Sequence, residues 1–121
     1  VVETVAVGNI LGHISHDRSS AWGSGTAAET AALKAGFITP YASSAVDEDF
    51  VELIAVYVTN TEAYWQSRIK TAGTTGAPII NSKFEIVYNY MLDTWNIDLD
   101  ILRNTVLDHQ NRIGELDLDE L

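Results

Sequence analysis

Apolar residues recur with helical spacing along much of the chain, most clearly over residues 47–60. One stripe there falls at positions i, i+3, i+4, i+7 and i+8, and it consists of Phe50, Leu53, Ile54, Tyr57 and Val58. This spacing is typical of one face of a helix with 3.6 residues per turn. The sequence therefore predicts a central amphipathic helix over 47–60, with Ser44 or Asp47 as its N-cap.

Upstream of this helix the pattern alternates between helix and loop. Residues 1–16 make a rough helical stripe, and residues 17–26 make a polar, Gly- and Ser-rich loop. Residues 27–34 predict a short Ala-rich helix that Gly36 closes as the C′ glycine. Residues 37–45 predict an extended loop that leads into the central helix.

Downstream, the pattern predicts a helix over 61–72 that begins at a threonine cap. Residues 73–78 predict a loop because they hold two glycines and a proline. Ser82 and Glu85 have the spacing of a capping box, which predicts a further helix ending near Trp95.

The last part of the chain predicts one more helix and a tail. Asp98 is placed to cap this helix, and residues 112–121 are expected to form an acidic, frayed tail. We therefore predict one all-α domain over residues 1–121, a compact helical bundle.

Composition limits the kind of site that the chain can build. The 121 residues suit one domain with a packed core, since 46% of them are apolar. There are no cysteines, so a metal site would need His, Asp or Glu. No apolar run approaches the ~20 residues of a transmembrane helix. The chain opens on Val1 without a leader, and we expect a fragment or processed piece of a longer protein.

The formal net charge of −10 narrows the range of partners. It argues against nucleic acid and against an anionic membrane surface, which both need a basic face. A negative net charge favours binding of cations, or it contributes only to solubility.

Carboxylates at the start of the central helix are the first candidates for chemistry. Glu48 and Glu52 are four residues apart and share one face, and Tyr41 precedes Glu48 by seven residues. On the pattern alone, a solvated helix edge is the favoured interpretation. His13 and His16 are three apart and could share a face, whereas His109 lies in a polar helix and is expected at the surface.

Several motifs resemble one protein family. The segments Ile-Thr-Pro-Tyr-Ala-Ser-Ser at 38–44 and Asp-Glu-Asp-Phe-Val-Glu at 47–52 resemble the stretch that carries the third metal ligand in that family. The family is that of the substrate import-associated zinc metallohydrolase lipoproteins, also described as zinc-binding metallopeptidases. The resemblance covers roughly 34–107. Its further motifs are Gly36-Phe37, Glu62-x-x-Trp65, Lys83-x-x-Ile86-Val87-x-x-Tyr90-Met91 and Trp95-x-Ile97-Asp98-Leu99-Asp100.

The resemblance implies a fold, a metal and a place in the cell. The fold would match the C-terminal subdomain of a zincin, as in the lethal-factor-like zincins. Glu48 would be a zinc ligand, Glu52 would orient a metal-bound histidine, and Tyr41 would stabilise an oxyanion. The family also implies an outer-membrane lipoprotein encoded beside glycan-uptake proteins, with peptide or glycan-uptake proteins as partners.

The chain departs from the family upstream. Zincins carry His-Glu-x-x-His on a helix, and this sequence has no such motif. Its nearest match is the run 9–16, where His13 would be a metal ligand. Asn9 and Ile10 stand where the first histidine and the catalytic glutamate are expected. Either the chain is a degenerate relative, or the metal-binding helix is missing or altered in it.

The sequence is compatible with three functions. The first is a zinc metallopeptidase-like hydrolase, with impaired activity because no base stands at position 10. The second is a metal-free binding or assembly module on the same scaffold. The third is an acidic helical interaction domain, in which Tyr41 and Glu48 would be exposed and point apart. A missing front half would leave apolar surface, which a homodimer would cover.

Overall fold

The computed structural model describes residues 22–120, with side chains through residue 113. All regular structure in this part is helical, so the predicted all-α fold is confirmed. The elements are α2 (Gly25–Lys34), the 3-10 helix η2 (Tyr41–Ser44), α3 (Val46–Thr59), α4 (Glu62–Trp95) and α5 (Leu99–Glu120). The helix predicted over 1–16, together with His13 and His16, lies outside the described residues.

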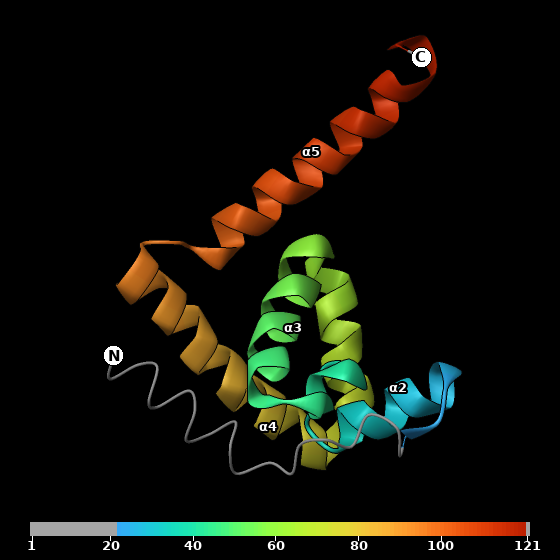
Figure 1. The fold of residues 1–121 in the computed structure, drawn as a ribbon, viewed down its shortest axis with the longest axis vertical. Helices are drawn as coiled ribbons and strands as arrows, with labels where there is room; N and C mark the ends of the chain where they lie inside the picture. Colours follow the sequence, from blue (N-terminus) through green and yellow to red (C-terminus); the bar gives the residue numbers. More distant parts are fainter. Residues whose placement is uncertain (1–21, 121) are drawn as a thin grey trace.

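Helix α3 lies at the centre of the molecule (Figure 1). It packs against η2, α4 and α5, and α2 packs against α4. The stripe predicted for the central helix faces inward, with Leu53, Tyr57 and Val58 buried and Phe50 and Ile54 partly buried. These side chains join one core with fully buried residues of the other elements, among them Leu33, Phe37, Ile80, Val87 and Leu99.

The central helix begins one residue earlier than predicted, and its cap differs. The N-cap is Ala45, and no side chain accepts a hydrogen bond there. The predicted caps were wrong because both residues are engaged otherwise. The Ser44 hydroxyl donates to the carbonyl of Tyr41 at 2.8 Å, and Asp47 already lies inside the first turn.

The predicted loop over 73–78 and the capping box that follows it are both wrong. Helical geometry breaks only at Gly73 (φ 72°, ψ −166°), where α4 kinks between two helical segments, so the predicted helix end near Ala72 is confirmed. Residues 74–78 already belong to the second segment and do not form a loop. Gly76 serves packing instead, because a Cβ there would lie 2.0 Å from the carbonyl oxygen of Leu33 in α2. Ser82 and Glu85 consequently lie inside a helix that is already under way.

Three other predicted helix ends are confirmed. Gly36 takes a positive φ of 95° after α2, and the N–H of Phe37 reaches back to the carbonyl of Ala32 at 2.9 Å. The Thr61 hydroxyl accepts from the N–H of Tyr64 at 3.2 Å. The Asp98 carboxylate accepts from the N–H groups that open α5.

The predicted frayed tail over 112–121 is also corrected, because the backbone of α5 stays helical to Glu120. After Gly114 the sequence holds no glycine or proline, and its Glu and Leu residues favour helix. Figure 1 shows the far half of α5 reaching beyond the other helices. Within 22–120, no helix is long and apolar enough to cross a membrane.

Candidate metal centre

Three consecutive carboxylates lie in the first turn of α3, and each side chain is in a different environment. Successive side chains are about 100° apart around a helix. Asp47 is therefore exposed, Glu48 is partly buried and Asp49 is fully buried. All three lie in the first turn, where free N–H groups and the helix dipole favour negative charge. Glu48 makes no hydrogen bond or ion pair with any described residue.

A buried ion pair anchors this turn to the rest of the molecule. The Lys83 ammonium of α4 lies 2.8 Å from the Asp49 carboxylate, and both side chains are fully buried. The same ammonium donates to the carbonyl of Gly36 at 2.7 Å and lies 4.3 Å from the centre of the Phe37 ring. Burial lowers the pKa of Lys83, and the Asp49 carboxylate opposes that shift. One lysine thus joins α4, the start of α3 and the end of α2.

The loop before α3 presents Tyr41 to solvent. Tyr41 begins η2, and its side chain is 54% exposed. Below it, the Trp22 indole donates to the Ser43 hydroxyl at 2.8 Å, and Ser43 donates to the carbonyl of Pro40 at 2.7 Å. The backbone of η2 is therefore braced, while the phenol of Tyr41 has no hydrogen-bonding partner among residues 22–120.

Glu52 ties the same loop to α3. The Thr39 hydroxyl donates to the Oε1 atom of Glu52 at 3.0 Å and accepts from the N–H of Ala42 at 3.1 Å. The second carboxylate oxygen of Glu52 makes no hydrogen bond to a described residue. Glu52 thus holds the loop that presents Tyr41 and keeps one oxygen available to another donor.

A second charged cluster lies where α3, α4 and α5 meet. Arg103 donates to the carbonyl of Tyr57 at 2.8 Å and to Glu62 at 2.5 Å, and it covers the Tyr57 ring at 3.6 Å. Hydrogen bonds from Arg103 and Gln66 lower the pKa of Glu62. The Tyr57 phenol donates to Asp100, and burial with this bond raises its pKa. These contacts stabilise the helix packing.

The neighbouring Tyr88 shares the same carboxylate. Its phenol donates to Asp100 at 3.1 Å, and burial together with this hydrogen bond raises the pKa of Tyr88 to about 12. Both tyrosines therefore stay protonated at neutral pH.

The described residues alone do not complete a metal site. No group of three or more His, Asp or Glu side chains within 22–120 is placed to hold an ion. Tyr41, Glu48 and Glu52 all belong to η2 and α3, which pack together, and a carboxylate such as Glu48 is a ligand type that zinc accepts. The predicted ligand His13 lies outside these residues, and His109 is exposed on α5, as expected.

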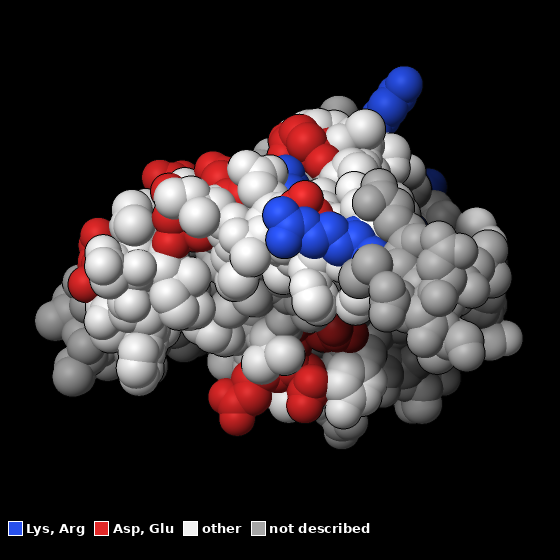
Figure 2. Space-filling view, turned by 90° about the horizontal axis from the view of Figure 1, so that it is seen from above, with Lys and Arg blue, Asp and Glu red and all other residues white. Residues whose placement is uncertain are grey.

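Charge is unevenly distributed over the surface. Figure 2 shows acidic side chains in several groups on the face seen from above, with few basic ones between them. This agrees with the excess of 17 Asp and Glu over 7 Lys and Arg. Such a surface favours cations over anions at long range.

Residues 12–100 match the model of a protein family described as "Putative zinc-binding metallo-peptidase". The chain belongs to this family. The match includes the loop with Tyr41 and the whole of α3 and α4, so the family's sequence pattern covers the candidate site. No curated protein matches the chain.

A solved structure supports the same assignment. The chain is similar to a putative zinc-binding metallo-peptidase from Bacteroides caccae ATCC 43185, with 36% sequence identity and a TM-score of 0.78. The similarity covers 95% of this chain but 42% of the Bacteroides protein. The chain therefore spans less than half the length of that relative, and it corresponds to one helical portion of it.

The Asp49–Lys83 pair was not predicted from the sequence, although a signal for it was present. Lys83 lies three residues after Ile80 and four before Val87, and both of those residues are fully buried. This spacing places Lys83 on the buried stripe of α4. A lysine on such a stripe needs a buried partner.

Proposed function

We propose that this chain supplies the carboxylate portion of a zinc metallopeptidase site, in which Glu48 binds the metal. The observation that supports this most strongly is the environment of Glu48. Its carboxylate is partly buried between a solvated and a paired neighbour, on a rigid helix, and no residue within 22–120 neutralises it. Membership in a family described as zinc-binding makes a metal ion the natural partner of this charge.

Tyr41 and Glu52 have supporting roles in the proposal. The exposed phenol of Tyr41 can donate a hydrogen bond to the negative oxygen that develops during attack on a peptide carbonyl. The free oxygen of Glu52 can accept from a metal-bound histidine, while its other oxygen holds Thr39. Zinc, when bound, would polarise that carbonyl as a Lewis acid. His13 is the proposed histidine ligand.

Reduced or absent hydrolysis is part of the proposal. The sequence has Asn9 and Ile10 where the family pattern expects a histidine ligand and the base. The same observation favours a second candidate function, a metal-free binding module on this scaffold. From the resemblance we further propose that the chain acts at the cell envelope, in a glycan-uptake system.

Zinc titration separates the two candidates. We expect the chain to bind one zinc ion, and Glu48→Ala to lose that ion because a first ligand is gone. Glu52→Gln should weaken binding by about 10- to 100-fold, the usual effect of losing a residue that orients a ligand. The matched control is Asp47→Ala, which removes the exposed neighbouring carboxylate and should change nothing.

Calorimetric titration, with elemental analysis of the purified chain, gives the result directly. No zinc by either method would reject the metal-binding proposal. If the melting temperature is then also unaffected by a chelator, the metal-free module is supported.

A further inference from the structure

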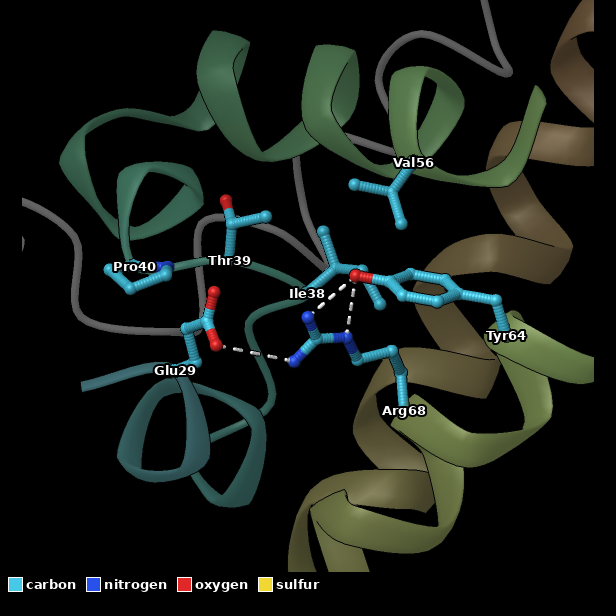
Figure 3. Close-up of a pocket in the computed structure, with 7 residues that line it drawn as sticks. All are labelled: Glu29, Ile38, Thr39, Pro40, Val56, Tyr64 and Arg68. Carbon is cyan, nitrogen blue, oxygen red and sulfur yellow. Dashed lines mark hydrogen bonds and ion pairs between the residues drawn. The ribbon is translucent and has the colours of Figure 1, made fainter. Parts of the chain in front are cut away.

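A small pocket opens beside the loop that carries Tyr41 (Figure 3). Its volume is about 120 Å³. Ile38, Pro40 and Val56 provide apolar walls, and Glu29, Tyr64 and Arg68 provide the polar groups. Residues from α2, the loop, α3 and α4 therefore meet around one small space.

Arg68 is held in one orientation at this pocket. Its Nε and Nη2 atoms both donate to the Tyr64 phenol, at 3.0 Å and 2.5 Å. The guanidinium carbon lies 4.9 Å from the centre of the same ring, and the side chain is only 23% exposed. A cation fixed in this way has little conformational entropy left to lose when it binds a ligand.

One edge of the guanidinium remains available. Its Nη1 atom lies 3.8 Å from the Glu29 carboxylate, which is beyond hydrogen-bonding distance. Glu29 itself is 46% exposed and can move into solvent. Among residues 22–120, no other acceptor bonds to Nη1, so a ligand oxygen could replace the loose contact with Glu29.

The chemistry of the pocket selects its ligand. A planar guanidinium presents paired N–H groups that match the two oxygens of a carboxylate. The small volume and apolar walls fit a carboxylate with its adjoining carbons. The acidic group inside the pocket is Glu29, and a bound carboxylate would have to displace it from Arg68.

The pocket shares its wall with the proposed peptidase site. Pro40 directly precedes Tyr41, and Thr39, which also lines the pocket, donates its hydroxyl to Glu52. We propose that Arg68 forms a subsite for a carboxylate of a peptide substrate, either its C-terminus or an acidic side chain. Its role in substrate choice rests on the proposed function, but carboxylate binding itself requires neither zinc nor Tyr41.

The test is a ligand titration of the chain in excess chelator, followed through the methyl signals of Ile38 and Val56 by NMR. Three probes are compared. Acetyl-Ala-Ala carries only a terminal carboxylate, the amide of acetyl-Glu carries only a side-chain carboxylate, and acetyl-Ala-Ala-amide carries none. We expect saturable shifts from at least one carboxylate probe and none from the uncharged probe. Which carboxylate binds identifies the source.

Substitutions of Arg68 and of Glu29 should change the affinity for the carboxylate probe in opposite directions. Arg68→Gln should weaken binding at least about tenfold, since it removes a charge-assisted pair. Arg68→Lys keeps the positive charge but loses the paired N–H groups, so its affinity should lie between those of the wild type and Arg68→Gln. Glu29→Gln should tighten binding, because it removes the competing carboxylate at 3.8 Å. The matched control, Arg112→Gln on exposed α5, should leave binding unchanged.

The subsite is rejected if the uncharged probe shifts the methyl signals equally, if no probe saturates, or if Arg68→Gln binds as the wild type does. Because the titration excludes metal, its failure is independent of the zinc result. Zinc binding without carboxylate binding would leave the proposed function standing and remove only the subsite.

Discussion

At the scale of single residues, the first turn of α3 separates three carboxylates by their surroundings. Asp49 has a structural role, since it pairs with Lys83 in the core, and Asp47 is exposed to solvent. Of the three, only Glu48 is partly buried and makes no hydrogen bond or ion pair with a described residue. Lys83 binds both Asp49 and the carbonyl of Gly36, so this one side chain holds the first turn of α3, which carries Glu48, in place.

Replacing the buried lysine should therefore be costly. Lys83→Met leaves the Asp49 carboxylate in the core without its cation, and breaking a buried pair in this way typically costs about 3–5 kcal/mol. The measurement is the free energy of unfolding in urea. Lys70→Met, at an exposed position of the same helix, is the control and should stay within about 0.5 kcal/mol of wild type. Equal effects would show that the pair contributes little.

At the scale of elements, the contact between α2 and α4 depends on a missing side chain. The carbonyl of Leu33 occupies the place where a Cβ of residue 76 would lie, 2.0 Å from it. The glycine that resembles a loop signal is thus a packing position, and it lets two helices approach closely.

Gly76→Ala tests this contact. In an exposed helix the change would stabilise by about 1 kcal/mol through helix propensity. Here the clash with backbone should outweigh that gain, with a net loss of about 1–3 kcal/mol, as in other overpacked sites. Thermal unfolding provides the measurement, and Thr75→Ala at the neighbouring exposed position is the control. A stabilised Gly76→Ala variant would contradict the close approach.

Helix periodicity predicted α3 to within one residue, because its apolar stripe is long and its interior holds no Gly or Pro. The sequence signals were misleading after Gly73, where Gly76 and Pro78 are typical of a loop. The helical position of Gly76 is explained only by its contact with Leu33 of α2, which the sequence pattern does not show. Caps were predictable where the side chain bonds its own turn, as at Thr61 and Asp98. The cap was not predictable at Ser44, because its hydroxyl donates to the carbonyl of Tyr41 within η2 instead.

At the scale of the whole molecule, charged contacts hold the three longest helices together. Arg103 of α5 bonds to the backbone of α3 and to Glu62 of α4. The lowered pKa of Glu62 means that this carboxylate stays ionised to lower pH in the folded chain than in the unfolded one. Its contribution is therefore present above the unfolded pKa of about 4.3 and is lost as pH falls through the folded pKa.

The expected pH dependence is a loss of stability toward acid that Glu62→Gln reduces. The unfolding free energies of wild type and variant should differ most near neutral pH and converge as the pH falls through the lowered folded pKa of Glu62. Urea unfolding at several pH values measures this difference. Glu85→Gln, at an exposed position of α4, provides the comparison. A constant difference between wild type and Glu62→Gln would mean that the Arg103 contact does not depend on this charge.

The family could be predicted from sequence, because the motifs that carry the resemblance, with Tyr41, Glu48 and Glu52 among them, lie on a contiguous loop and helix. The roles of these three residues stay predictions. The pocket at Arg68 could not, since its lining residues run from position 29 to position 68 and meet only in the fold. Lys83 was visible in the buried stripe of α4, but the identity of its partner needed the packing of α3 against α4.

The most direct test of the central claim is the anomalous diffraction of zinc in crystals of the chain grown with the metal. We expect a peak within the usual ~2.0–2.2 Å of a Glu48 carboxylate oxygen. Crystals of Glu48→Ala should lack this peak. No peak at Glu48 in wild-type crystals, or one that persists unchanged in Glu48→Ala, would contradict the assignment of Glu48 as the metal ligand.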